Sequence, residues 1–298
     1  MKHLSIIILT YNSENDIYDC LKSVYQYNDI GERLEIIVVD NQSRNFAVMQ
    51  QKIATLYPNI VITQNTHNGG YGQGNNVGIK LAQAPIIAVM NPDVRLIMPV
   101  FAEMIDRVQQ EDVVMCAGKQ YGGDGSLYAS FFSLFTVPWW FGRPLEYFSR
   151  RVIDTYFYRL QYLSGAFFIM RKDIMEDIGM FDENIFMYAE ENDIHHRIRK
   201  MFPNMKMKYL NHLAYIHLAE NRPFSSKHVK QVYISNGYFF TKNGKNPVKY
   251  WRQQMRMNIF LDLFYSLRNI VRNNHQDIVH LKERNQILRT LIEEYKLH

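Results

Sequence analysis

The first third of the chain alternates short apolar runs with segments of helical periodicity. After the first run, Asn12 and Ser13 can cap a helix, and Ile17, Leu21 and Val24 then recur at helical spacing. An alternation of strands and helices is typical of an α/β fold with a mostly parallel sheet and helices on both faces. The apolar runs that predict strands are Leu4–Leu9, Leu34–Val39, Ile60–Ile62 and Pro85–Met90.

Polar residues follow three of these apolar runs. They are the segments 10–12 (TYN), 40–41 (DN) and 91–93 (NPD). In open α/β sheets, ligands bind at the carboxyl ends of the strands. We therefore expect these three segments to meet at one edge of the sheet and to form a binding site there.

The middle of the chain has a different pattern. The segment 68–74 is predicted to be a glycine-rich loop that precedes a helix at about 75–84. Residues 121–162 are rich in aromatic side chains and have no regular pattern. Two interpretations of the aromatic segment stay open: a loop that packs its own aromatic side chains, or a mobile wall of an acceptor site. An apolar run then follows residues 164–166, helices are expected from about 172 and 190, and a strand should end near His217.

From about residue 227 the pattern is helical. We predict one domain over 1–240, with halves at about 1–120 and about 121–240, and a helical extension over 241–298. No stretch approaches the roughly 20 apolar residues of a membrane-spanning helix, and no cleavage site follows Met1, so we expect neither a spanning helix nor a signal peptide. Cys20 and Cys116 fit no disulfide framework or metal motif and are expected to be buried thiols of a cytoplasmic protein.

The C-terminal region combines positive charge with an apolar stripe. The chain has a formal net charge of +5 and a pI near 9.0. Between residues 245 and 272, cations alternate with an apolar stripe that includes Trp251, Ile259, Phe260 and Leu263. A basic amphipathic helix with aromatic residues can lie in a membrane interface. The alternatives are a stripe that packs on the catalytic domain or in a homodimer contact; we expect no nucleic-acid partner.

Two residues could bind a divalent cation. Asp93 follows an apolar strand, and His217 ends another. A carboxylate in this position suits a hard cation that bridges phosphate oxygens, and a neutral imidazole can complete its ligands. The alternatives are that Asn91-Pro92-Asp93 is only a turn and that His217 is structural.

Three carboxylates crowd one helix start. Glu190, Glu191 and Asp193 occupy three of four consecutive positions. Their mutual repulsion is expected to raise at least one pKa, which a general base acting on a sugar hydroxyl requires. The alternative is that these acids only complement the helix dipole.

The glycines between residues 69 and 78 also raise the possibility of another class of enzyme, a nucleotide-sugar oxidoreductase. That class predicts a glycine fingerprint after the first strand, whereas these glycines follow the third. A backbone without Cβ atoms can instead approach a nucleotide or a sugar closely, or a helix can simply pack closely at Gly78.

Taken together and in order, these segments resemble the inverting family-two glycosyltransferases of the GT-A fold. The similarity covers about residues 4–220 and is greatest to the rhamnosyltransferase-like enzymes of bacterial surface polysaccharides. The matching segments are 5–12 (SIIILTYN), 37–43 (IVVDNQS), 68–79 (NGGYGQGNNVGI), 90–94 (MNPDV), 164–166 (SGA), 179–183 (GMFDE), 190–193 (EEND) and His217.

The resemblance implies that residues 1–240 are a catalytic domain, with a nucleotide-sugar half at about 1–120 and an acceptor half at about 121–240. It also implies the residues of the nucleotide-sugar site. Thr10, Asn12 and Asp40 would hold the nucleoside, and Asp40 would read the pyrimidine edge. The remaining residues that it implies for the donor nucleotide and its sugar are Asn68, Gly69, Asn75, Asn91, Gly165 and Ala166.

The resemblance also implies the reaction. Asp93 would bind Mg²⁺ or Mn²⁺, although relatives carry Asp-x-Asp where this chain has Asn91-Pro92-Asp93. His217 would be a second metal ligand, and Arg222 would add positive charge near the leaving group. Glu191 would be the base, one methylene longer than the aspartate that relatives usually carry, and this leaves Asp193 and Glu190 as alternatives.

The implied function is a single displacement that moves a sugar from a nucleotide diphosphate to a glycan or an undecaprenyl-linked glycan in cell-surface polysaccharide synthesis. Rhamnose from dTDP-rhamnose is the first donor that we expect, and UDP-galactofuranose or another UDP-hexose is the alternative. The enzyme would be cytoplasmic, with peripheral contact at the inner face of the membrane. A competing class is a non-catalytic glycan-assembly subunit, which predicts loss of the acidic cluster.

Overall fold

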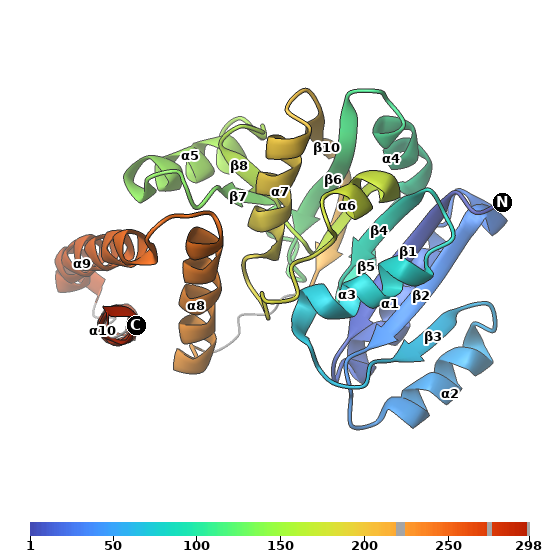
Figure 1. The fold of residues 1–298 in the computed structure, drawn as a ribbon, viewed down its shortest axis with the longest axis horizontal. Helices are drawn as coiled ribbons and strands as arrows, with labels where there is room; N and C mark the ends of the chain where they lie inside the picture. The colour runs from blue at the N-terminus through green and yellow to red at the C-terminus, as the bar shows by residue number, and fades with distance from the viewer. Residues whose placement is uncertain (219–223, 273–275, 297–298) are drawn as a thin grey trace. The chain divides into compact units, whose positions relative to one another are not determined.

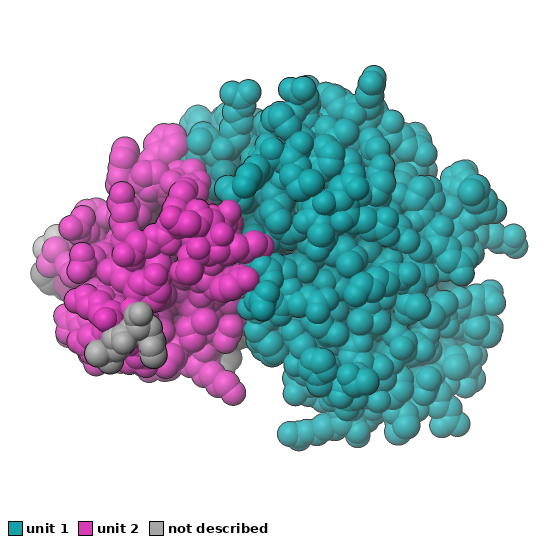
Figure 2. All heavy atoms as spheres, viewed as in Figure 1, with its two compact units in different colours: residues 1–134, 145–186, 190–220 teal, residues 135–144, 187–189, 221–298 magenta. Residues whose placement is uncertain are grey.

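The structure is a computed structural model that describes residues 1–218, 224–272 and 276–296. The chain divides into two compact units, which Figure 2 shows in different colours. The first unit comprises residues 1–134, 145–186 and 190–220, and the second comprises residues 135–144, 187–189 and 221–298. The predicted boundary after residue 240 stays a prediction; in space, helix α8 groups with the helices that follow it.

One eight-stranded sheet forms the centre of the first unit (Figure 1). Its strands lie in the order β3-β2-β1-β4-β9-β6-β10-β5. A separate two-stranded sheet pairs β7 with β8. The strands are β1 Leu4–Thr10, β2 Leu34–Asp40, β3 Val61–Gln64, β4 Ile86–Met90, β5 Val94–Leu96, β6 Val113–Tyr121, β7 Phe131–Ser133, β8 Gln161–Leu163, β9 Phe167–Arg171 and β10 Lys206–His217.

The pairing of the strands fixes which of their ends share an edge. Strand β1 is parallel to both β2 and β4. Strand β9 is antiparallel to β4 and to β6, and β6 is parallel to β10. The carboxyl ends of β1, β2, β4, β6 and β10 therefore lie at the same edge of the sheet. The predicted α/β class with a mostly parallel sheet is confirmed, and β9 and β5 are its antiparallel members.

Alternate residues of each strand enter two separate cores, because successive side chains point to opposite faces. Ile6 and Ile8 of β1 belong to the core that also receives buried residues of α1, α2 and α4. Ile7 belongs to the core that includes residues of α3, α6 and α7. The helices of this unit are α1 Glu14–Gln26, α2 Phe46–Leu56, α3 Gly70–Leu81, α4 Phe101–Val108, α6 Lys172–Asp177 and α7 Glu190–Met201, with a short 3-10 helix at Gly31–Arg33.

The glycine-rich segment differs from its prediction. It forms the first turns of α3, which begins at Gly70 rather than near residue 75. Glycine is unfavourable in a helix interior by roughly 1 kcal/mol, so its presence calls for close packing. A Cβ at Gly70 would collide with the backbone of Phe186, and one at Gly78 would collide with Ile7 of the sheet. Tertiary packing therefore overrides the low helix propensity of this segment.

The aromatic segment is more regular than predicted. It contains β7, β8 and the helix α5 Trp139–Arg151, which begins in the second unit and ends in the first and has Pro144 inside it. Phe131 of β7 is buried and packs against Tyr156 and Tyr209, with ring centres 5.6 and 5.0 Å away. Part of the segment thus packs its own aromatic side chains, as one of the two interpretations predicted.

Three helices make up most of the second unit: α8 Ser226–Lys242, α9 Pro247–Arg272 and α10 Gln276–Lys296. Their buried core contains Tyr250 and Trp251 of α9, and the Trp251 ring lies so close to Gly237 of α8 that a Cβ there would collide with it. Within the described part of the chain, no helix is long and apolar enough to cross a membrane. The N-terminal half of the α9 stripe is therefore a core element of this unit.

Candidate active site

Asp93 and His217 meet at the sheet edge. Asp93 lies between β4 and β5, and His217 is the last residue of β10. His217 Nε2 lies 3.2 Å from Asp93 Oδ1, and the two side chains are only 12% and 16% exposed. Asn91 Nδ2 lies 3.5 Å from the same imidazole nitrogen. Residues that are 124 positions or more apart in the sequence thus form one polar group at the edge.

Backbone hydrogen bonds fix this group in place. The Asn91 amide donates to the Ala166 carbonyl over 2.8 Å, and the Leu218 amide donates to the Asp93 carbonyl over 2.9 Å. His217 also pairs with Val94 in the antiparallel register of β10 and β5. The segment 91–93 is therefore held on both sides, by the loop before β9 and by the end of β10.

The donors of this group suit a divalent cation. Adjacent ligands of an octahedral ion with bonds of about 2.1 Å lie roughly 3 Å apart, close to the separation of Asp93 Oδ1 and His217 Nε2. Among the described residues, no group of three or more His, Cys, Asp or Glu side chains could hold a metal, so phosphate oxygens or water would supply the other ligands. His217 Nδ1 is buried without a hydrogen-bond partner in the described part of the chain.

Glu191 lies against Gly165. Glu191 is in the first turn of α7, and a Cβ at Gly165 would collide with its carboxylate. The Tyr71 hydroxyl donates to the Gly165 carbonyl over 2.8 Å. Burial raises the pKa of Glu191, and backbone hydrogen bonds from Glu191 itself and from Gly165 oppose the shift only in part. A carboxyl with a raised pKa is suited to accept a proton near neutral pH.

Tyr71 shows that the carboxylates share one neighbourhood. Burial raises the pKa of Tyr71 well above its ordinary value, and the charges of Glu191, Glu190 and Asp93 raise it further. The hydrogen bonds place the two regions side by side: Gly165 contacts Glu191 and the Tyr71 hydroxyl, and the carbonyl of the next residue, Ala166, accepts from the Asn91 amide. The structure therefore brings the predicted base region and the predicted metal residue into one site.

His195 positions the start of α7. Its Nδ1 bonds the Glu191 carbonyl over 2.7 Å, and its Nε2 accepts from the Leu163 amide over 2.9 Å. Because Nε2 accepts, the ring carries its hydrogen on Nδ1, and burial keeps the pKa of His195 well below its ordinary value. The neutral ring thus joins the first turn of α7 to β8, directly before the segment 164–166.

The other two acids of the cluster are deeply buried. Glu190 is 3% exposed, and Asp193 is fully buried. Asp193 Oδ2 pairs with Arg197 Nε at 2.8 Å, and Arg197 also donates to the Ile178 carbonyl. Asp193 is thereby engaged within α7, whereas the Glu191 carboxylate lies at Gly165.

Asp40 is the centre of a buried hydrogen-bond network at the end of β2. Its carboxylate accepts from Thr10 Oγ1 at 3.1 Å, from the Ser43 amide at 2.8 Å and from Gln64 Nε2 at 2.9 Å. The Ser43 hydroxyl donates to it as well and accepts from the Asn12 amide at 2.7 Å. Thr10 thus bonds Asp40 directly, and Ser43 links Asp40 to Asn12, so the three residues predicted to hold the nucleoside belong to one network.

The remaining predicted donor residues lie at the start of α3. Asn68 Oδ1 accepts from the Gly70 amide at 3.0 Å, and Gly69 is the N-cap of the helix. Asn75 is fully buried; its Nδ2 donates to the Tyr71 carbonyl over 2.9 Å, and its Oδ1 has no partner in the described part of the chain. These residues shape the loop backbone, and their contact with a donor stays a prediction. Arg222 lies outside the described residues.

Sequence reasoning missed several residues of this site: Tyr71, Ser43, Gln64 and His195. Ser43 and Tyr71 fall inside quoted motifs, but neither has a residue type that suggests a role by itself. Tyr128, whose ring centre lies 6.3 Å from that of His217, belongs to the aromatic segment 121–162 but was not singled out within it.

The fold and the site define the class of protein: an α/β domain of the GT-A type with a polar site at the strand ends. Residues 5–179 match the family described as Glycosyl transferase family 2. Because this match covers more than half of the chain, the protein belongs to glycosyl transferase family 2.

Two curated relatives resemble the chain in part. A poly(ribitol-phosphate) beta-glucosyltransferase of Bacillus spizizenii is 35% identical over 92 residues, which are 30% of this chain and 14% of that protein. The low-salt glycan biosynthesis hexosyltransferase Agl10 of Haloferax volcanii is 24% identical over 209 residues, which are 66% of this chain and 62% of that protein. The chain thus spans less than two thirds of the length of both relatives.

Solved structures share the fold. TarS 1–349 of S. aureus superposes with a TM-score of 0.57 at 17% identity and covers all of this chain and 92% of that one. The mannosyltransferase PcManGT from Pyrobaculum calidifontis, in complex with GDP-Man and Mn²⁺, gives 0.56 at 15% identity and covers 81% and 64%. At these identities the likeness establishes the GT-A fold and leaves the substrates open.

Proposed function

We propose that the protein is a divalent-cation-dependent, inverting glycosyltransferase that moves a sugar from a pyrimidine nucleotide diphosphate to a hydroxyl of a glycan acceptor. The observation that carries the proposal is one site in which Asp93 and His217 lie 3.2 Å apart, while the adjoining segment 165–166 contacts both Asn91 and Glu191. This site lies at the edge where α/β sheets bind ligands, in a chain of glycosyl transferase family 2.

In the proposed reaction, Glu191 is the base. Its carboxylate takes the proton of the acceptor hydroxyl while that oxygen forms a bond to the anomeric carbon. The bond between the anomeric carbon and the diphosphate breaks on the opposite face, so one displacement inverts the centre. Because Gly165 has no side chain, the Glu191 carboxylate can lie directly against it. His195 holds the first turn of α7, which carries Glu191.

Asp93 and His217 would hold the cation, which supplies positive charge to the diphosphate that leaves. Their proximity supports this role, and so does the Mn²⁺ that is named with the neighbour of similar fold. Because Asp93 supplies one carboxylate to the cation, the affinity for the cation would depend on further oxygen ligands from the donor phosphates. We therefore expect the cation and the nucleotide to bind together.

The donor is open to a direct test. dTDP-rhamnose is the first candidate, from the resemblance in the sequence motifs, and UDP-galactofuranose or another UDP-hexose is the alternative. The names of the two partial relatives, a glucosyltransferase and a hexosyltransferase, support a hexose as the sugar. Slow release of the nucleotide from a panel of nucleotide sugars, with Mn²⁺ or Mg²⁺ present, identifies the donor without knowledge of the acceptor. Hydrolysis of none of them, together with no binding of UDP or dTDP, would overturn the proposed activity.

We also propose that the outer face of α9 touches anionic membrane, as a lipid-linked acceptor requires. Arg252 and Arg256 lie on the same exposed stripe as Ile259, Phe260 and Leu263, which are 48%, 54% and 62% exposed. These positions recur at helical spacing, so cations and apolar side chains share one face. Each cation near an anionic surface adds on the order of 1 kcal/mol.

The same unit adds aromatic residues to this stripe. The Trp139 ring lies 5.6 Å from that of Phe260, and the neighbouring Trp140 is 65% exposed. Tryptophan is enriched at membrane interfaces, which supports a lipid surface over a purely polar one.

Co-sedimentation with vesicles that contain anionic lipid tests this proposal in the full chain. Phe260→Ser with Leu263→Ser should lower the bound fraction severalfold, as should Arg252→Gln with Arg256→Gln, and 1 M salt should weaken the wild type. Leu56→Ser, which alters a side chain of similar exposure on α2, is the matched control. Equal binding of all variants, or binding by none, would leave the stripe a protein-packing surface.

A further inference from the structure

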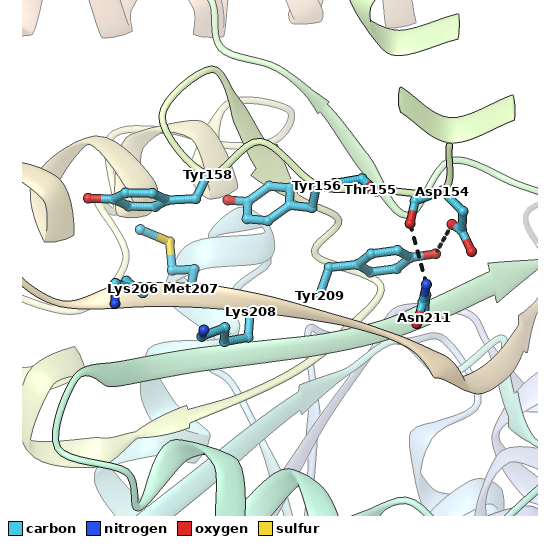
Figure 3. Close-up of a pocket in the computed structure, with 9 residues that line it drawn as sticks. All are labelled: Asp154, Thr155, Tyr156, Tyr158, Lys206, Met207, Lys208, Tyr209 and Asn211. Atoms are coloured by element: carbon cyan, nitrogen blue, oxygen red, sulfur yellow. Dashed lines mark hydrogen bonds between the residues drawn. The ribbon is translucent and has the colours of Figure 1, made fainter. Parts of the chain in front are cut away.

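A cavity of about 330 Å³ lies beside the first half of β10, whereas the candidate active site lies at the end of that strand. Figure 3 shows its two walls: residues of the segment 154–158 face side chains that project from the first half of β10. The lining includes Tyr156, Tyr158, Tyr209, Lys206, Lys208 and Asn211. Small-molecule sites have volumes of about 300–1,000 Å³, so this cavity has room for a single small ligand.

The cavity and the candidate active site occupy opposite ends of one strand. Lys208 lies near the start of β10, and His217 ends it. Lys208 and Ile216 pair with Cys116 and Tyr121 of β6, which are five residues apart, because β10 bulges after Leu210; at about 3.3 Å per residue, Lys208 and His217 therefore lie roughly 20 Å apart. None of the residues that line the cavity belongs to the site at Asp93 and His217.

The walls of the cavity are braced from behind. The Tyr209 hydroxyl donates to Asp154 over 2.9 Å, and Lys119 pairs with the other oxygen of that carboxylate. The Arg199 guanidinium lies 5.4 Å from the centre of the Tyr158 ring and donates to the Tyr158 carbonyl. The aromatic wall therefore has a fixed shape without a ligand, and Asp154 is already neutralised.

The charge that remains at the cavity is positive. Lys208 makes no hydrogen bond or ion pair with any described residue. Lys206 pairs with Asp112 at 2.7 Å, but both side chains are about half exposed, and such pairs exchange readily with other ions. Two ammonium groups beside tyrosine rings can meet an anion and the apolar face of a small ring together.

We propose that this cavity binds an anionic sugar unit, with its phosphate or carboxylate at Lys208 and Lys206 and its ring against Tyr158. That the unit belongs to the acceptor glycan rests on the proposed transferase function; the binding itself does not. A site at the far end of β10 would hold a repeat of a charged polymer while another part of it reaches Glu191.

Saturation-transfer NMR on the full chain tests this with glucose 1-phosphate as the probe. The ring protons of the probe should receive saturation. Glucose, observed directly, and inorganic phosphate, which has no carbon-bound proton and is followed by its displacement of the probe, each lack one half of the recognised chemistry and should bind at least about tenfold more weakly. Glucuronate should bind if the site accepts either anion. Phosphate that binds as tightly as glucose 1-phosphate would overturn the sugar site.

Three variants locate the binding. Lys208→Met should weaken it about tenfold, and Tyr158→Ala should abolish saturation of the ring protons. Lys22→Met, at an exposed lysine of α1, should have no effect, and Asp93→Ala should retain the binding. Loss in Asp93→Ala with retention in Lys208→Met would assign the probe to the donor site and overturn the proposal. Because this measurement needs no turnover, its outcome is separate from that of donor hydrolysis.

Discussion

The sheet edge and the first turn of α7 both bring carboxylates to the site, but they fix them differently. At the edge, Asp93 is placed by backbone hydrogen bonds and by the strand register, and it meets His217. On α7, Glu191 and Asp193 are two residues apart, which is a rotation of about 200° around the helix axis, so their side chains point to nearly opposite faces. One lies at Gly165 and the other pairs with Arg197. Neighbours in sequence are thus expected to differ in role, while distant residues share one.

The edge is tested most severely by removal of its carboxylate. Asp93→Ala should lower metal-dependent turnover by a factor of about a thousand, because a cation contributes several kcal/mol to the stabilisation of the leaving diphosphate. Circular dichroism and the melting temperature should stay close to those of the wild type. Asp106→Ala, at an exposed carboxylate of α4, is the control. Turnover and metal dependence that remain near normal in Asp93→Ala would remove Asp93 from the cation site.

The first turn of α7 is tested by single amide substitutions. Glu191→Gln should lower turnover by a factor on the order of a hundred or more, as loss of a general base does, and should leave donor binding intact. Glu190→Gln and Asp193→Asn, assayed as folded protein, are the comparisons. A nearly silent Glu191→Gln beside an inactive Asp193→Asn would show that the roles of the two carboxylates are reversed.

Asp193 should matter more for stability than Glu191 does. Asp193→Asn should lower the free energy of unfolding by about 3 kcal/mol, because it leaves the largely buried Arg197 without its charge partner. Urea denaturation measures this change. Glu176→Gln breaks the exposed pair with Lys172 and should cost under about 1 kcal/mol. Equal costs for both variants would contradict the buried role of Asp193.

The sequence predicted the edge better than the helix. Asp93 and His217 each follow an apolar run, and parallel strands bring their carboxyl ends together whatever the distance along the chain. The acidic cluster was visible, but the direction of each side chain depends on where α7 begins and on His195, which has no distinctive pattern. The helical start at Gly70 was missed because close packing against Phe186 and Ile7, which the sequence does not display, outweighs helix propensity.

The C-terminal helices show the same limit. The stripe of α9 is continuous in sequence, yet Tyr250 and Trp251 are buried in the second unit whereas Phe260 and Leu263 are exposed. The periodicity of a sequence identifies the apolar face of a helix. It does not show which turns of that helix are covered by a neighbouring helix. The first half of the stripe thus packs inside the second unit, and the contact of the exposed half stays a prediction.

The pH dependence of stability gives the smallest expected effect. Burial raises the pKa of Glu191 in the folded chain above its unfolded value of about 4.3. The carboxyl therefore contributes stability that is fully present below the unfolded pKa and is lost as the pH rises through the folded pKa. Glu191→Gln should raise the melting temperature at pH 8, and the gain should vanish near pH 4. A lower melting temperature at pH 8 would contradict a destabilising buried charge.

Asp93 and His217 are proposed to bind a cation together with the donor diphosphate. Isothermal titration of UDP and dTDP, with and without Mn²⁺, measures this in wild type, Asp93→Ala and His217→Ala. We predict that Mn²⁺ strengthens binding of at least one nucleotide by at least about tenfold in the wild type, and that both variants lose this enhancement while they keep the weaker metal-free binding. Nucleotide affinity that is the same with and without Mn²⁺ in the wild type, or an enhancement that survives in Asp93→Ala, would contradict the account.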